Sequence, residues 1–186
     1  MHPPRTEHDR QRAKSLLVFI VRAGSDGILG RARLYKAFYA AHVIYLRDHG
    51  RALTPWPLVH MPYGPGVDEG DALLQELESE RAVLAERALV GPYAASRYRP
   101  GPESSRYRLD EAPAAEAVTK AVTWVEARST AQLTADTHDF SRSWQATRDG
   151  EELPIALDTM SDDEYATAIR SVEAAKEDLG ALFPTA

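Results

Sequence analysis

The feature that most constrains this fold is the segment from Gly30 to His49, which carries apolar side chains on two adjacent helical stripes. One stripe holds Leu34, Ala37, Phe38, Ala41 and Tyr45, and the next holds Tyr35, Tyr39, His42 and Leu46. A helix that is apolar over so wide an arc needs neighbours on both sides, so the segment predicts a central helix. At helical spacing these aromatic residues indicate a packed core rather than a cofactor site, and His42 indicates a hydrogen-bonded buried histidine rather than a ligand.

Several other segments have the spacing of amphipathic helices with one buried side. We expect these helices from about Ala13 to Gly24, Asp68 to Glu80, Pro113 to Val125, Thr130 to Asp139 and Ser161 to Gly180. The last one opens with Ser161-Asp162-Asp163-Glu164, the sequence of a capping box. Residues 51–66 are rich in proline and glycine and predict a loop, with Leu58 to Met61 extended.

Residues 83–109 predict extended chain that is interrupted by turns. Within them, Arg97-Tyr98-Arg99 and Arg106-Tyr107-Arg108 alternate with a period of two on either side of a turn-forming segment, 100–105, which is typical of a β-hairpin. Alternation places the four arginines on one face and Tyr98 and Tyr107 on the other. The predicted fold class is therefore mainly α within an α+β arrangement. It is a helical domain of about five to six helices, with a small winged-helix-like β-hairpin after the third helix.

The length of 186 residues is that of one domain. We expect a flexible N-terminus over 1–12, a single domain over 13–180 and a C-terminal tail over 181–186. The longest strongly apolar run, Leu16 to Val21, is far shorter than the roughly 20 residues of a membrane-spanning helix, and no signal-peptide cleavage site follows it. The chain contains no cysteine, so packing alone must stabilise it. These observations predict a cytoplasmic protein that does not engage a membrane.

Charge is distributed unevenly along the chain. Residues 1–60 hold ten Lys or Arg and four Asp or Glu, a balance of +6, whereas residues 61–186 hold twelve and twenty-four, a balance of -12. This asymmetry has three interpretations: a basic surface for nucleic acid or an acidic partner, a solvated face, or charges that complement each other inside the molecule.

Motifs that carry chemistry are missing from the sequence. Gly64-Pro65-Gly66 lacks the Lys-Ser/Thr of a phosphate-binding loop, and the six histidines contain no HExxH pair. His138 beside Asp139 suggests acid–base chemistry, but residues adjacent in a helix do not face each other, so we favour a structural role in capping a turn together with Thr137. We therefore expect no cofactor, no metal and no enzymatic activity.

A winged helix-turn-helix that binds DNA is an alternative, because three helices precede the arginine-rich hairpin. A helix that enters the major groove should not be acidic, since contacts with phosphates supply most of the affinity. The third helix holds six acidic residues before its first basic residue, Arg81: Asp68, Glu69, Asp71, Glu76, Glu78 and Glu80. DNA binding is thus disfavoured. Arginine and tyrosine in alternation suit a protein interface equally well.

The order of several short motifs resembles the Panacea domain, also called the SocA-like antitoxin domain. The apolar segment from Leu34 to His42 is similar to the family's first aromatic helix, and Tyr63-Gly64-Pro65 resembles its Tyr-Gly-Pro. Leu133 to His138 is similar to the family's Leu-Ser-x-x-Thr-His, with Trp144 following. The arginine–tyrosine hairpin is a departure from the family pattern. We expect the motif residues Tyr63, Gly64, Pro65, Thr137, His138 and Trp144 to be structural.

The resemblance implies an antitoxin-like protein-binding module of a prokaryotic or phage toxin–antitoxin system. Such a module neutralises a cognate toxin by direct binding or delivers it to a protease, and self-association is a further option. The candidate partner-binding residues are those of the expected hairpin: Arg97, Tyr98, Arg99, Arg106, Tyr107 and Arg108. The alternative to a binding surface is a solvent-exposed hairpin at the edge of a sheet, whose charges discourage aggregation.

Overall fold

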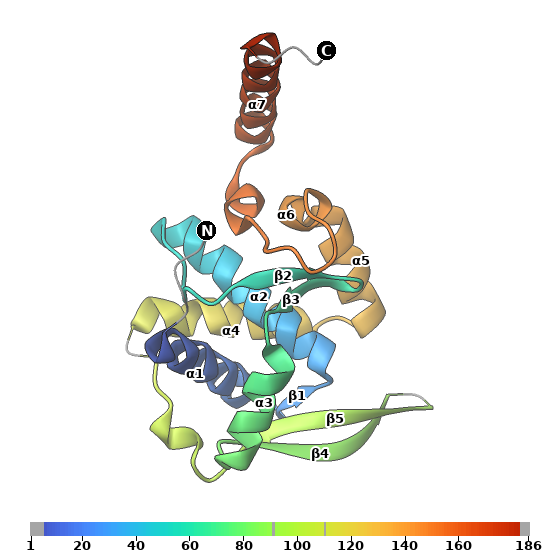
Figure 1. The fold of residues 1–186 in the computed structure, drawn as a ribbon. Coiled ribbons are helices and arrows are strands. Elements are labelled where there is room, and N and C mark those ends of the chain that lie inside the picture. Colours follow the sequence, from blue (N-terminus) through green and yellow to red (C-terminus); the bar gives the residue numbers. More distant parts are fainter. Residues whose placement is uncertain (1–5, 91, 110, 183–186) are drawn as a thin grey trace.

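The computed structural model of the protein describes residues 6–90, 92–109 and 111–182, with side chains described as far as residue 175. The central element is α2 (Arg31–His49), which packs against α1 (Glu7–Ala23), α4 (Ala112–Glu126) and β3 (Gly64–Val67) (Figure 1). The central helix predicted from the two apolar stripes is confirmed. Its C-terminus is closed by Gly50, which has the expected left-handed conformation at φ 67°.

His42 on α2 is completely buried and fully hydrogen-bonded. Its Nδ1 lies 2.9 Å from the carbonyl oxygen of Phe38, and its Nε2 lies 3.0 Å from Thr54 Oγ1. Burial lowers the pKa of this imidazole to about 4, so the ring stays neutral at ordinary pH. The expectation of a hydrogen-bonded core histidine is confirmed.

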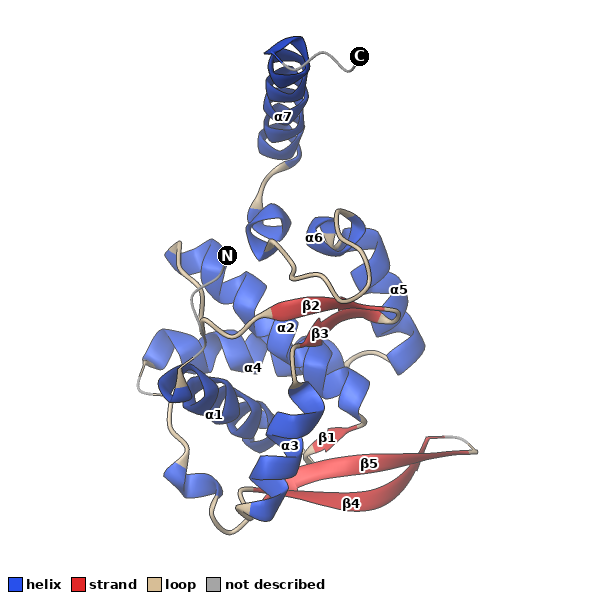
Figure 2. Ribbon diagram, in the orientation of Figure 1, coloured by secondary structure: helices blue, strands red, loops and turns tan. Residues whose placement is uncertain are grey.

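Two antiparallel sheets flank the helices (Figure 2). The larger has the strand order β1 (Ile28–Leu29), β5 (Tyr93–Pro100), β4 (Val83–Val90), and the smaller pairs β2 (Leu58–Met61) with β3. The extended conformation expected for Leu58 to Met61 is confirmed, whereas β1 and β3 were not predicted. The fold is therefore mixed α+β, with α3 (Gly70–Ser79) between the two sheets in the chain.

The predicted position of the hairpin is wrong. Its strands are β4 and β5, with Val90 opposite Tyr93, and the segment expected as the turn starts at the end of β5 and continues into a 3-10 helix, η1 (Ser104–Arg106). The second Arg-Tyr-Arg triplet cannot pair with the first, because β5 already has β4 on one edge and β1 on the other. Gly101 permits the tight turn, since a Cβ there would lie 2.1 Å from the carbonyl oxygen of Arg81.

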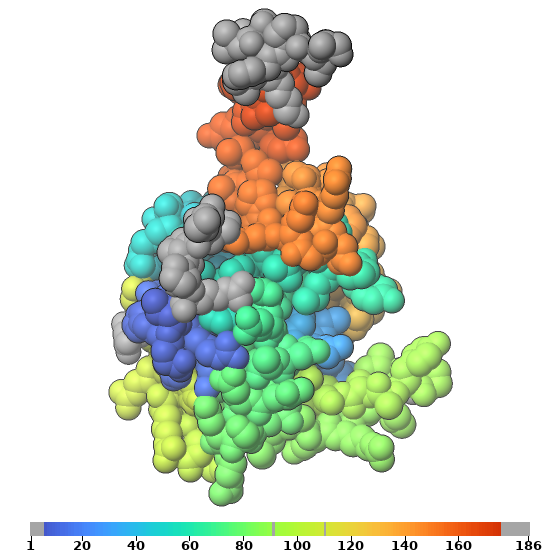
Figure 3. Space-filling view, in the orientation of Figure 1, coloured from blue at the N-terminus to red at the C-terminus, as the bar shows by residue number. Residues whose placement is uncertain are grey.

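The C-terminal part consists of α5 (Thr130–Phe140), α6 (Arg142–Gln145), the 3-10 helix η2 (Ile155–Thr159) and α7 (Asp162–Leu182). The α7 helix projects away from the rest of the molecule (Figures 1 and 3). The capping box predicted at its start is confirmed by the hydrogen bond from Glu164 N to Ser161 Oγ, 3.3 Å, and by that from Ser161 N to Glu164 Oε2, 2.8 Å. Seven α-helices occur in the described residues, one or two more than expected.

The expected boundaries differ at both ends of the chain. Residues 7–12, assigned to a flexible N-terminus, belong to α1, which starts at a capping box formed by Thr6 and Asp9. At the other end α7 extends past Gly180 to Leu182, and residues 183–186 of the expected tail lie outside the described part. Among the helices of the described residues, none has both the length and the apolar composition that crossing a membrane requires.

Candidate functional site

The structure brings together two motifs that are more than seventy residues apart in the sequence. Tyr63 lies in the turn between β2 and β3, and Gly64 and Pro65 begin β3. This segment packs against α5 and α6, which carry Thr137, His138 and Trp144. Trp144 Nε1 donates a 2.9 Å hydrogen bond to the carbonyl oxygen of Met61. We call these six residues the motif cluster.

Lys36 on α2 holds the motif cluster together. Its side chain is only 3% exposed, and its Nζ donates hydrogen bonds to the carbonyl oxygens of Tyr63, 2.6 Å, and Pro65, 3.1 Å. Burial lowers the pKa of this amine to about 7. Lys36 could not be identified from the sequence, because a single lysine within an apolar helix has no spacing signal of its own.

Gly64 is the residue that lets this turn approach α2 so closely. Its φ is 95°, in the left-handed region, and a Cβ on it would lie 2.4 Å from Lys36 Nζ and 2.6 Å from Thr137 Oγ1. The Thr137 hydroxyl donates to the carbonyl oxygen of Leu133, 2.8 Å, within its own helix. The contacts of Gly64, Pro65 and Thr137 agree with a structural role, whereas Tyr63 takes part only through its carbonyl oxygen and its side chain is 73% exposed.

Trp144 lies between two histidine rings. Its ring centroid is 4.0 Å from that of His138 and 4.4 Å from that of His60, and both pairs are stacked. His138 Nε2 is buried and has no hydrogen-bond partner among the described residues. Desolvation, followed by the positive charge of Lys36, lowers the pKa of His138. His138 thus acts by stacking, and the expected turn cap through its imidazole is not what the geometry shows.

The hydrogen bonds of the motif cluster are made with its surroundings: Trp144 Nε1 donates to Met61, and the Thr137 hydroxyl donates to Leu133. No group of three His, Asp or Glu side chains suited to a metal ion occurs in the described residues. Asp139 follows His138 without a hydrogen bond between their side chains. As arranged, the cluster fixes the β2–β3 turn onto α2 and presents no nucleophile–base pair.

The six candidate partner-binding residues do not share one ribbon. Arg97, Tyr98 and Arg99 lie on β5, whereas Arg106, Tyr107 and Arg108 lie in or just after η1. The rings of Tyr98 and Tyr107 are buried, at 7% and 6% exposure, so neither is available at the surface. The Tyr107 hydroxyl donates to Glu80 on the edge of the core.

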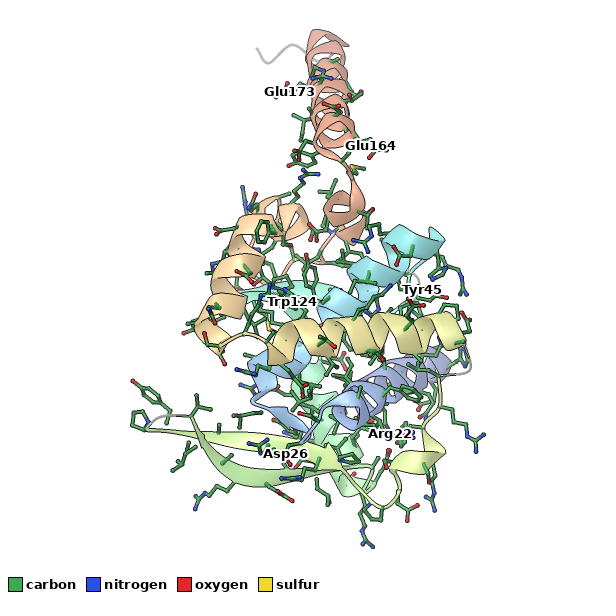
Figure 4. The ribbon with its side chains drawn as sticks, turned by 180° about the vertical axis from the view of Figure 1, so that it is seen from behind. Arg22, Asp26, Tyr45, Trp124, Glu164 and Glu173 are labelled. Atoms are coloured by element: carbon green, nitrogen blue, oxygen red, sulfur yellow. The ribbon has the colours of Figure 1, made fainter. Side chains whose placement is uncertain are left out.

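Most of these arginines are also engaged within the molecule. Asp26, labelled beside the β5 strand in Figure 4, accepts ion pairs from Arg97, 2.9 Å, and Arg99, 2.6 Å. Arg99 also pairs with Glu86, 2.8 Å, and Arg106 pairs with Glu103, 2.7 Å. The arginines therefore contribute less free positive charge than the sequence suggested.

The acidic third helix is likewise neutralised by α1. Arg10 binds Glu76 and, at 2.9 Å, Glu69, while Lys14 binds Glu80 at 2.5 Å. Part of the basic N-terminal charge thus complements the acidic helix inside the molecule. For these residues, the charge asymmetry along the sequence reflects opposite charges that complement each other inside the molecule.

The most exposed apolar surface is the outer half of the β4–β5 hairpin, which extends clear of the body (Figure 3). Three large side chains are exposed there: Leu89 (71%), Val90 (41%) and Tyr93 (74%). We call residues 84–90 and 93–97 the hairpin arm. Scattered exposed apolar residues are normal, whereas these three lie together at the end of one hairpin, with Val90 paired to Tyr93 and Leu89 on the opposite face of the ribbon.

A groove separates the hairpin arm from the N-terminus of α2. It has a volume of about 590 Å³ and is lined by Arg87, Val90 and Tyr93 of the arm and by Arg31 and Ala32 of α2. A second pocket of about 570 Å³ shares Arg31 and Ala32 and continues to Tyr63 and Pro65. The two pockets are separate, and we call the first, between the arm and α2, the arm groove.

The β4 strand is the outer edge of its sheet. Gly101 N donates to the carbonyl oxygen of Ala82, 2.9 Å, so this carbonyl faces the β5 side of the hairpin. Since the direction of the backbone groups alternates along a strand, those of Ala85, Arg87 and Leu89 point outward. No described residue outside the sheet forms a backbone hydrogen bond with these three. The arm therefore combines apolar side chains with unpaired backbone groups.

Comparison with known proteins does not add a relative. The chain matches no protein-family model, no curated protein and no solved structure.

Proposed function

We propose that the chain is a protein-binding module of the antitoxin type, which captures a cognate toxin through the hairpin arm and the arm groove. The observation that carries the proposal is the exposed apolar tip formed by Leu89, Val90 and Tyr93. Aromatic and aliphatic side chains beside a groove are the anchors that protein interfaces use, because their burial removes apolar surface from water. Direct neutralisation and delivery to a protease both begin with this capture, which takes place in the cytoplasm.

The order of elements supports a winged-helix-like core. The elements α1, β1, α2, α3, β4 and β5 and the strand order β1-β5-β4 follow the winged-helix pattern, with β2 and β3 inserted between α2 and α3. In this comparison the hairpin arm is the wing. An apolar wing favours a polypeptide over a phosphate backbone, and a fold can keep its shape while its ligand changes.

The test is co-expression with the product of the neighbouring open reading frame. The wild-type chain should restore the growth of cells that express that product, and it should co-purify with it. A chain with Leu89→Ser and Tyr93→Ser should do neither, although its melting temperature should be unchanged. Phe140→Ser is the matched control, because Phe140 is 78% exposed on α5, outside the arm. Capture that survives the double substitution would remove the arm from the proposal.

A DNA-binding regulator is the second candidate, and the winged-helix order of elements is the observation that favours it. The position of the recognition helix is taken by α3, which carries no basic residue to contact phosphates. Arg10 and Lys14 of α1 are paired with Glu69, Glu76 and Glu80 at this helix. We expect no duplex binding at low salt. Binding that falls steeply with added salt would favour this second candidate instead.

A further inference from the structure

The outer edge of β4 carries backbone groups that an extended chain can bind. The strand lies at the edge of its sheet opposite β1 (Figure 2). The N–H and C=O groups of Ala85, Arg87 and Leu89 point away from β5, and no described residue outside the sheet bonds to them. Residues two apart in a strand are separated by about 6.8 Å, so these groups form a regular row of donors and acceptors. Another strand presents the complementary groups at the same spacing.

The β4 edge lacks most of the features that prevent strand addition. The strand contains no proline, glycine or lysine, and its pairing with β5 continues without a bulge from Val83 to Val90. All of its side chains except those of Val83 and Ala88 are exposed. An added strand can therefore span residues 84–90.

The two charged side chains of β4 differ in what they contact. Glu86 forms an ion pair with Arg99 of β5, 2.8 Å, whereas Arg87 has no ion pair among the described residues. Arg87 lines the arm groove, and Ala85 and Leu89 are its neighbours on the same face of the strand. An added strand is therefore favoured by an acidic side chain opposite Arg87 and by apolar side chains opposite Ala85 and Leu89.

We propose that β4 pairs with an extended segment of the toxin, in which one acidic residue is flanked at every second position by apolar residues. This inference rests on the proposed function, and it specifies the partner as a protein with an accessible strand. The added strand extends the sheet beside the exposed apolar side chain of Leu89. In complexes of this kind the main-chain hydrogen bonds give affinity, and the side chains at alternate positions give specificity.

The first experiment titrates the full chain with the peptide Thr-Val-Thr-Glu-Thr-Val-Thr, which places its glutamate opposite Arg87 in either strand direction. We expect a dissociation constant of about 1 mM in amide NMR spectra. Bound peptide should slow the hydrogen exchange of the outward amides of Ala85, Arg87 and Leu89. The amides of Glu86 and Ala88 face β5 and should keep their exchange rates. A peptide with lysine in place of the glutamate should bind about fivefold more weakly.

The second experiment repeats the titration with variants of β4. Ala85→Pro removes one outward N–H and should weaken binding of the glutamate peptide about tenfold, whereas Ala85→Val keeps the N–H and should bind like the wild type. Proline at an outward position of an edge strand leaves the pairing with β5 intact, so the melting temperatures of the two variants should agree. Arg87→Glu should reverse the preference and bind the lysine peptide more tightly than the glutamate peptide.

Strand addition would be overturned if neither peptide bound, if exchange slowed equally at all residues of β4, or if the Ala85→Pro and Ala85→Val chains bound alike. An Arg87→Glu chain that still prefers the glutamate peptide would also overturn it. In the co-expression assay, Ala85→Pro should weaken capture of the neighbouring gene product. If Ala85→Pro captured that product fully while the double substitution at Leu89 and Tyr93 did not, the proposed function would stand and strand addition would be refuted.

Discussion

Lys36→Met should abolish a pH dependence of stability that the wild-type chain shows above neutral pH. The pKa of Lys36 is about 7 in the native protein, below its ordinary value of 10.5. Between these values the unfolded chain binds a proton that the native chain does not, so the free energy of unfolding rises with pH. Burial of the amine is the cause, because it penalises the charged form.

The magnitude follows from the two pKa values. The full difference corresponds to about 5 kcal/mol, at about 1.4 kcal/mol per pH unit. Between about pH 7.5 and about pH 9 the free energy of unfolding should rise by about 2 kcal/mol. This interval avoids the titration of His42, whose pKa is lowered to about 4, and that of the buried tyrosines Tyr35 and Tyr39, whose pKa values are raised by burial.

The measurement is urea unfolding followed by tryptophan fluorescence at both pH values. Lys36→Met removes the titrating amine but leaves the carbonyl oxygens of Tyr63 and Pro65 without their donor, at a cost of about 1–3 kcal/mol each. Its absolute stability therefore changes, and the pH dependence is the informative quantity. Lys120→Met is the control, since Lys120 is exposed on α4 and should leave the dependence intact. A flat wild-type profile, or a Lys36→Met profile that still rises, would refute the reasoning.

Two further predictions concern stability. Gly64→Ala should lower the free energy of unfolding by about 2–4 kcal/mol in urea titration, because the new Cβ meets Lys36 in a left-handed conformation; Gly50→Ala, at φ 67° rather than 95° and with nothing within 4 Å, should cost about 1 kcal/mol. Equal losses would show that backbone strain alone is responsible. Arg99→Glu should lower the melting temperature more than Arg106→Glu, because Arg99 bridges two carboxylates and Arg106 pairs with one. The reverse order in calorimetry would contradict the ion-pair geometry.

The helices could be predicted from the sequence because their signals are local. The two stripes from Leu34 to Leu46 and the capping box at Ser161 depend on residues within a few turns of each other. The hairpin could not be placed in the same way. The Arg-Tyr-Arg triplets have ideal alternation, yet β5 pairs with β4 and with the two-residue β1, and strand partners chosen by tertiary packing leave no periodic signal.

The candidate site was foreseen only in part. The motif residues lie together in the structure. Lys36 donates hydrogen bonds to Tyr63 and Pro65, but nothing in the sequence distinguishes it from other positions of its helix. The apolar arm was also missed, because Leu89, Val90 and Tyr93 look like core residues in the sequence and only the projection of the hairpin exposes them. Tyr98 and Tyr107 were expected to contact a partner, but tertiary packing buries their rings, and the alternation of the sequence does not indicate which face is covered.

The open edge of β4 has a consequence for solubility. Its sequence, Val-Leu-Ala-Glu-Arg-Ala-Leu-Val, reads the same in both directions except at the central charges. When the β4 edges of two copies pair antiparallel about a twofold axis, side chains opposite each other lie on the same face of the sheet. Even-numbered residues must therefore pair with even-numbered ones, and odd-numbered residues with odd-numbered ones. The two registers with the longest overlap then set Glu86 against its own counterpart, or Arg87 against its own. Like charges directly opposite each other are destabilising, so pairing between two β4 edges is disfavoured. The outward backbone groups of β4 can still form hydrogen bonds with a strand of different sequence.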